Sequence, residues 1–106
     1  MRSDVIAQKL LVYAEKIIRY CNGCTYEEFV EDTMLVEACV FNLSQMGELC
    51  RNIEPQFAAA YPKIPWSEMY GLRNRIVHDY EGVNLLLVWE IISEDLPVLC
   101  ENLKTI

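Results

Sequence analysis

Apolar residues recur at helical spacing along this chain, and that pattern narrows the folds open to it. In residues 4–21 they return every three or four positions, as on one face of an amphipathic helix. Residues 33–53 carry two such stripes, so this longer helix is expected to bury two faces. Residues 85–92 are apolar on nearly all sides, and no segment alternates as a half-buried strand does. The sequence therefore predicts an all-α bundle with up-down neighbours.

Capping residues and prolines divide this pattern into about five helices. Thr25 and Glu28 have the spacing of a capping box and predict the start of a short second helix. Pro65 suits the first turn of a helix, and Asn84 can cap the apolar helix that follows it. A chain of 106 residues is expected to form one domain, residues 1–106, with a core that needs neither disulfides nor metal.

The charge balance limits how the chain could bind an anion. Its net charge of −7 argues against nucleic-acid binding through a broad positive field. An anion site would therefore depend on a local group of cations, and Arg51, Arg73 and Arg75 are the candidates. The apolar fraction of 53% is slightly above the globular average, which fits additional surface buried in an oligomer.

The cysteines and the hydropathy pattern bear on the compartment. Five cysteines, an odd number, indicate a reducing environment, so a cytoplasmic protein is expected. Cys21 and Cys24 form a lone C-x2-C with no second pair, so free thiols rather than a metal site are predicted. No stretch is long and apolar enough to span a membrane, and there is no signal-peptide pattern.

Residues 72–82 carry the residue types with the most distinctive chemistry. They include the only histidine, His78, whose unperturbed pKa of about 6.5 allows proton exchange near neutral pH. Arg73 offers a planar, charged fork suited to phosphate oxygens. A base that takes the ribose 2′-OH proton and a cation that stabilises the resulting charge suffice to cleave RNA. With one histidine per chain, an acid–base pair of histidines needs two chains, as in a dimer with its site on the two-fold axis.

The spacing of these residues constrains the local structure. On one continuous helix Arg73 and His78 would diverge by roughly 140°, whereas Asn74 and His78 would share a face. The helix is therefore expected to end near His78, with residues 79–82 as the following turn. On residue types alone, capping and packing roles for His78 and Tyr80 are the alternative, because an isolated Arg-x4-His is a weak motif.

The pattern Arg73-Asn74-x3-His78-x-Tyr80 resembles the Arg-x4-His-x-Tyr signature of HEPN domains in the HepT-like toxin family. The flanking residues are similar too, from Ile64-Pro65-Trp66 to Asp95-Leu96-Pro97. The resemblance implies a HEPN-like bundle that forms a homodimer. It also implies the toxin of a toxin–antitoxin system, an endoribonuclease that uses no metal or other cofactor, with a composite active site at the dimer interface.

The resemblance also implies roles for individual residues. His78 would act as general base or acid, Arg73 would hold the scissile phosphate, and Asn74 would position them. A minimal nucleotidyltransferase antitoxin would bind the toxin and transfer AMP to Tyr80. The added phosphate would place negative charge beside Arg73 and His78 and compete with the RNA phosphate.

Other residues near the motif have two interpretations. Glu48, Arg51 and Arg75 are candidates for lining an active-site cleft, but Glu48 and Arg51, one helical turn apart, also suit a solvated ion pair. Gly47 would permit close approach of another helix. Tyr70 and its apolar neighbours are expected in the core or an interface, although aromatic residues here could also stack RNA bases.

Two other functions remain open on the sequence. In the first, the chain is a non-catalytic HEPN module in which Arg73 and His78 bind a nucleotide or a partner protein. In the second, it is a helical dimer subunit without a ligand.

Overall fold

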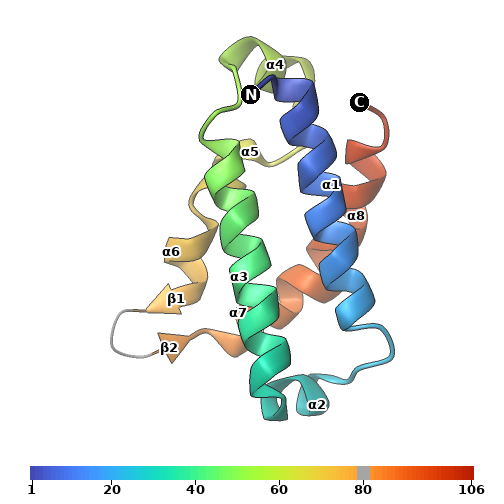
Figure 1. Ribbon diagram of the computed structural model, residues 1–106, viewed down its shortest axis with the longest axis vertical. Coiled ribbons are helices and arrows are strands. Elements are labelled where there is room, and N and C mark those ends of the chain that lie inside the picture. The colour runs from blue at the N-terminus through green and yellow to red at the C-terminus, as the bar shows by residue number, and fades with distance from the viewer. Residues whose placement is uncertain (79–81) are drawn as a thin grey trace.

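The structure, a computed structural model, describes residues 1–78 and 82–106, and of His78 the backbone alone. Its elements in chain order are α1 (Ser3–Tyr20), α2 (Tyr26–Glu31), α3 (Thr33–Cys50), α4 (Pro55–Ala60), α5 (Trp66–Tyr70), α6 (Leu72–Ile76), β1 (Val77–His78), β2 (Gly82–Val83), α7 (Leu85–Glu90), the π-helix η1 (Ile91–Asp95) and α8 (Leu96–Leu103). Figure 1 shows α1 and α3 side by side along the long axis, with α6, β1 and β2 at one edge. The predicted all-α class is confirmed. No helix of the described residues has the length and apolarity to cross a membrane.

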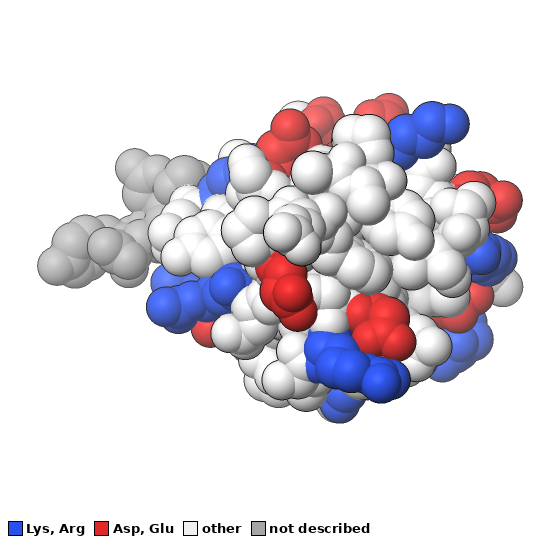
Figure 2. Space-filling view, turned by 90° about the horizontal axis from the view of Figure 1, so that it is seen from above, with Lys and Arg blue, Asp and Glu red and all other residues white. Residues whose placement is uncertain are grey.

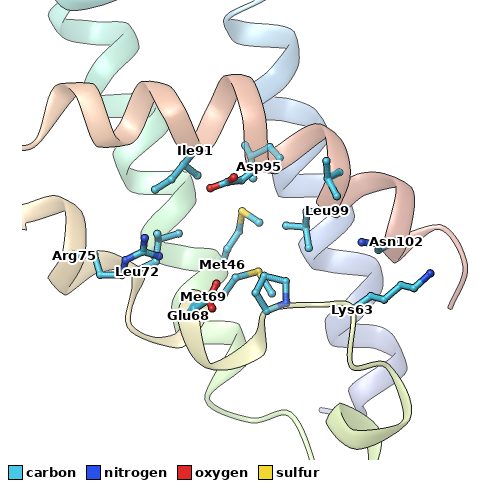
Figure 3. A pocket seen from close by; sticks show the side chains of 13 residues that line it. Met46, Lys63, Glu68, Met69, Leu72, Arg75, Ile91, Asp95, Leu99 and Asn102 are labelled. Carbon is cyan, nitrogen blue, oxygen red and sulfur yellow. The ribbon is translucent and has the colours of Figure 1, made fainter.

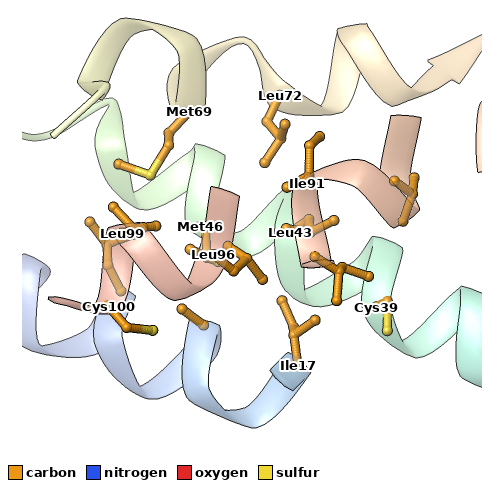
Figure 4. Close-up of a cluster of buried hydrophobic side chains, with 14 of the residues drawn as sticks. Ile17, Cys39, Leu43, Met46, Met69, Leu72, Ile91, Leu96, Leu99 and Cys100 are labelled. Atoms are coloured by element: carbon orange, nitrogen blue, oxygen red, sulfur yellow. The ribbon is translucent and has the colours of Figure 1, made fainter. Parts of the chain in front are cut away.

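The core lies where α1, α3 and the C-terminal helices meet (Figure 4). Ile17 of α1 and Leu43 and Met46 of α3 are fully buried there, and Leu96 and Leu99 of α8 are nearly so. A fully buried side chain of this size stabilises the fold by about 1.5–3 kcal/mol. Residues from both predicted stripes of α3 are buried, which confirms that this helix packs on two sides.

The predicted caps are present. The Thr25 hydroxyl accepts a hydrogen bond from the Glu28 N–H at 3.1 Å, and the Glu28 carboxylate accepts one from the Thr25 N–H at 3.0 Å. Asn84 caps α7 because its side-chain oxygen accepts a bond from the Leu87 N–H at 3.1 Å. These local signals fix where α2 and α7 begin.

A wide helical turn joins α7 to α8. In η1 the Leu96 N–H donates to the carbonyl of Ile91, five residues earlier. Pro97 follows at once; it has no N–H, and its ring would crowd the carbonyl of Ser93 in a regular α-helix. The π turn accommodates the proline and lets the helical run continue to Leu103.

Helices α3 and α5 approach each other closely at Gly47. A Cβ atom at this position would lie 2.7 Å from the Met69 carbonyl oxygen and 3.5 Å from that of Tyr70. Any larger residue would push α5 away from α3, so the expectation of close approach at Gly47 is confirmed. This contact fixes the backbone just ahead of α6.

The helix that carries Arg73 ends two residues before His78, which agrees with the predicted end near that residue. It stops at Ile76, and β1 pairs antiparallel with β2 through Val77 opposite Val83 and His78 opposite Gly82. Val77 is β-branched and favours extended backbone, and Gly82 adopts a φ of +81°, which suits glycine. Because His78 lies on a strand, the case of one continuous helix, in which Asn74 and His78 would share a face, does not arise. Residues 79–81 of the predicted turn lie outside the described residues.

Candidate active site

Three polar residues of α6 face solvent because two apolar residues hold this short helix to the bundle. Leu72 and Ile76, four apart, are 4% and 0% exposed, so one face of α6 is anchored in the core. Arg73, Asn74 and Arg75 lie on the remaining surface and are all exposed. The two arginines therefore keep their charges in water, where an anionic ligand can reach them.

His78 follows this helix on the strand β1. The chain turns to extended backbone at Val77, with φ −113° and ψ 123°, and the Asn84 N–H donates to the Ile76 carbonyl at 2.8 Å. That hydrogen bond closes the end of α6 and fixes the backbone of β1 beside it. The structure thus places the backbone of His78 two residues beyond α6. The His78 side chain and the whole of Tyr80 lie outside the described part of the chain.

Of the three candidate cleft residues, Arg75 lines a cavity, whereas Glu48 and Arg51 pair with each other. Arg75 lines a cavity of about 280 Å³ between the α5–α6 segment and the C-terminal helices, with Glu68 and Asp95 close by (Figure 3). Arg51 instead pairs with Glu48 at 3.3 Å near the end of α3. Both partners of that pair are more than half exposed, so the pair adds little stability. Within the part of the chain that the structure describes, neither Glu48 nor Arg51 lines the cavity that Arg75 lines.

Tyr70, which was expected in the core or an interface, does not lie in the core of the single chain. It is 55% exposed, whereas its neighbour Met69 is 5% exposed and takes the inward position. The guanidinium carbon of Arg51 lies 6.0 Å from the centre of the Tyr70 ring. Trp66 is half-buried as expected, and its Nε1–H donates to the Tyr61 carbonyl at 3.1 Å. The aromatic residue nearest to Arg73 in sequence is thus on the surface.

Positive charge is concentrated in residues 51–75 of this otherwise acidic chain. Residues 51–75 contain four of the nine cationic residues and two of the sixteen acidic ones, a net charge of +2. The rest of the chain therefore carries −9, since the total is −7. On the face shown in Figure 2, blue and red side chains are interspersed with wide uncharged areas. We therefore expect a polyanion to be attracted to residues 51–75 and not to the rest of the protein surface.

The cysteines are all free thiols in the structure. Cys21 and Cys39 place their sulfur atoms 3.6 Å apart between α1 and α3, a contact that the sequence spacing did not reveal. This contact and burial raise the pKa of the Cys39 thiol, and burial raises the pKa of Cys50 to about 12. Among the described residues, no three His, Cys, Asp or Glu side chains are grouped so that they could hold a metal ion.

Comparisons with known proteins identify the family. The model of the family described as "Ribonuclease HepT-like" matches residues 10–106. "Putative RNase TTE0752" of Caldanaerobacter subterraneus subsp. tengcongensis is 34% identical over 99 residues, covering 93% of this chain and 88% of that protein. "Putative RNase MJ1380" of Methanocaldococcus jannaschii is 33% identical, covering 92% of this chain and 89% of its own.

A further relative carries the family's own name. "Probable ribonuclease HepT" of Thermococcus cleftensis is 33% identical over 85 residues, covering 80% of this chain and 77% of that protein. No solved structure matches this chain. The family model and the relatives together span the helical scaffold as well as the Arg73–His78 segment. The chain therefore belongs to the HepT-like ribonuclease family.

Proposed function

We propose that this protein is the toxin of a toxin–antitoxin system and an endoribonuclease that needs no metal. One observation carries the proposal most directly: Arg73 is exposed on a short anchored helix immediately before the strand of His78. This segment lies within the residues that the ribonuclease family model matches. The names of the relatives, several of them RNases, support the same substrate class.

The residue chemistry supports cleavage through the ribose hydroxyl. A histidine acting as base takes the 2′-OH proton, and the 2′ oxygen then attacks the adjacent phosphorus. The bond to the 5′ oxygen breaks, that oxygen takes up a proton from an acid, and a cyclic phosphate remains on the upstream fragment. Arg73 binds the phosphate and stabilises the charge that develops on its oxygens. Asn74, beside Arg73 and exposed, positions these groups.

The need for both a base and an acid supports a composite site. The chain has one histidine, so a second imidazole comes only from a second copy of the chain. A two-fold axis near β1 would bring both His78 side chains and both Arg73 side chains to one RNA phosphate. The same arrangement doubles the local positive charge of residues 51–75, which offsets the acidic character of the whole chain.

Control of the toxin is part of the proposal. A minimal nucleotidyltransferase antitoxin binds the protein and transfers AMP to Tyr80, which lies two residues beyond His78. The added phosphate carries negative charge and competes with RNA for Arg73. Antitoxin and ATP are therefore expected to add the mass of AMP to the wild-type chain. Addition of the same mass to Tyr80→Phe would show that Tyr80 is not the acceptor.

The test of catalysis uses protein whose intact mass shows no added nucleotide, incubated with mixed RNA in excess chelator. Wild-type protein is expected to cleave, and His78→Ala is expected to be inactive while keeping its helical content and molar mass. Arg73→Ala is expected to lose about 100- to 1000-fold in rate, the usual effect of removing one group that stabilises transition-state charge. Arg19→Ala, an exposed arginine on α1, is the matched control and keeps full activity.

Each result separates the proposal from its alternative. Cleavage by His78→Ala at the wild-type rate would reject the catalytic role of His78. Absence of cleavage by the wild type, combined with nucleotide binding that Arg73→Ala abolishes, would instead favour the non-catalytic binding module.

A further inference from the structure

The fold leaves the Tyr70 ring without an aromatic packing partner among the described residues. Six aromatic side chains of the described residues pack in pairs, among them Phe29 with Trp89 at 5.2 Å and Phe57 with Tyr61 at 4.9 Å between ring centres. No such pair within residues 1–78 and 82–106 includes Tyr70, whose side chain is 55% exposed. A large exposed ring next to a candidate active site is available for a ligand.

Tyr70 lies close to Arg73 along the chain. Tyr70 ends α5, whose backbone is held against α3 at Gly47. The Gly71 N–H donates to the Ser67 carbonyl at 3.3 Å at the end of α5, and the Arg75 N–H donates to the Gly71 carbonyl at 3.2 Å at the start of α6, so the two helices follow each other directly at Gly71. Tyr70 precedes Arg73 by three residues, so their Cα atoms are at most about 11 Å apart.

Residues of the α5–α6 segment have different environments. Glu68, Leu72 and Arg75 line the cavity that faces the C-terminal helices (Figure 3). Tyr70 and Arg73 are not among the residues that line it, and both are exposed. Tyr70 and Arg73 are thus both open to solvent outside this cavity.

Arg51 supplies a second cation at this ring. Its guanidinium carbon is 6.0 Å from the ring centre, within the range of a cation–π contact. Glu48 accepts a hydrogen bond from Arg51 at 3.3 Å, which orients the guanidinium and offsets part of its charge. Tyr70 thus has Arg51 beside its ring and Arg73 three residues further along the chain, so a strand whose base covers the ring could place phosphates near either arginine.

We propose that Tyr70, with Arg51 beside it, forms a stacking subsite for one nucleobase of the RNA next to the phosphate held by Arg73. This inference rests on the proposed ribonuclease function and adds a base-binding residue to it. Stacking on a tyrosine ring accepts every base because each has a π face, and it orients the strand without reading its sequence. The subsite therefore sets which phosphate reaches Arg73 and His78, not which sequence is cut.

The test measures RNA binding by the full chain carrying His78→Ala, so that cleavage does not interfere. The probes are a fluorescent single-stranded oligoadenylate and a strand of equal length built from abasic spacers. Adding Tyr70→Ala is expected to raise the Kd for oligoadenylate roughly 5- to 100-fold, as for the loss of one stacked base. The Kd for the abasic strand is expected to stay unchanged, because that strand has no base to stack.

Two variants make the result specific. Tyr70→Phe keeps the ring and is expected to bind like the parent. Tyr20→Ala is the matched control, since Tyr20 also ends a helix and is 45% exposed, but lies on α1. Its Kd for oligoadenylate is expected to equal that of the parent.

The possible failures are distinguishable. Unchanged oligoadenylate binding by Tyr70→Ala, with RNA cleavage intact in the wild type, overturns the subsite and leaves the ribonuclease proposal standing. Equal losses on both strands overturn it as well, because the residue would then act on phosphate or on the fold. A changed molar mass of Tyr70→Ala in light scattering would mean that the ring packs against a second copy. Absence of both cleavage and RNA binding in the wild type would reject the function and the subsite together.

Discussion

The α1–α3–α8 bundle and the α6–β1 edge adjoin each other but use their residues in opposite ways. Helices α1 and α3 have 18 residues each and bury apolar side chains along their length. Helix α6 has five residues, of which Leu72 and Ile76 are buried and the other three are polar and exposed. Stability is therefore expected to depend mainly on the bundle, and ligand chemistry mainly on the edge.

The seam at Gly47 is where these two regions are coupled. There α3 approaches the backbone of Met69 and Tyr70, and α6 begins two residues after Tyr70. A change deep in the bundle and far from this seam should alter stability alone. A change at the seam should alter both stability and the position of Arg73. Three substitutions test this division, and they are ordered by the expected loss of stability.

The largest loss is expected for Phe29→Ala, at the opposite end of α3 from the seam. Phe29 is fully buried against Trp89, and its truncation should cost about 3–5 kcal/mol in free energy of unfolding. RNA cleavage per folded molecule should stay at the wild-type level, as measured below the unfolding transition in urea. The matched control is Phe41→Ala, because Phe41 is 61% exposed on α3 and should change stability by less than about 0.5 kcal/mol. A large cost for Phe41→Ala would show that a second chain covers this face.

An intermediate loss is expected for Gly47→Ala. The new methyl group would meet the Met69 carbonyl oxygen at 2.7 Å, and such overpacking should cost about 1–3 kcal/mol. Gly71→Ala is the control, since its methyl group would lie 3.9 Å from the Ser67 carbonyl oxygen, an ordinary van der Waals distance. This substitution should be neutral or stabilise the protein by up to about 1 kcal/mol. Only Gly47→Ala should also slow cleavage, because a displaced α5 moves α6. Wild-type cleavage by Gly47→Ala would show that the edge is not coupled to the bundle at this seam.

The smallest loss is expected for Thr25→Ala, which removes a helix cap far from the α6–β1 edge. Loss of such a cap typically costs about 1 kcal/mol at neutral pH. Hydrogen bonds from the Thr25 backbone N–H and with its side chain lower the pKa of Glu28 below the ordinary value of 4.5. Because the pKa of Glu28 is lower in the folded state, its ionised carboxylate stabilises the protein above pH 4.5. The protein loses this contribution as the pH falls through the folded-state pKa.

The difference in urea midpoint between Thr25→Ala and the wild type should therefore narrow in acid. Thr33→Ala, at the exposed first residue of α3, is the control and should show no such pH dependence. A difference that stays constant from neutral pH to acid would reject the coupling between Thr25 and the charge of Glu28.

Sequence reasoning succeeded where the deciding interactions are local. The caps at Thr25 and Asn84 depend on hydrogen bonds to residues three positions away, so their sequence spacing shows them. Helical periodicity likewise indicated that α3 buries two faces. Gly47 was identified as a point of close approach because only a residue without a side chain leaves such room.

The same reasoning expected the end of α6 near His78, but it showed neither the strand pair that follows nor the exposure of Tyr70 in the single chain. The helix ends at Ile76 because Val77 pairs with Val83 across the strand pair. No local sequence pattern predicted this strand pairing. Tyr70 is exposed because Met69 takes the position facing α3. A tyrosine at the end of a helix, followed by glycine and an arginine pair, was the available signal, and it is a weak one.

The sequence by itself determined the all-α class and the capped helix starts, since these follow from periodicity and short-range hydrogen bonds. It proposed Arg73, Asn74 and His78 as site residues from residue chemistry and a family resemblance. Only the tertiary structure decided that Arg75 faces the cavity while Arg51 lies beside Tyr70, and that Cys21 meets Cys39. These outcomes depend on how helices distant in sequence pack against one another, which is set by the shape of the whole core and not by any single segment.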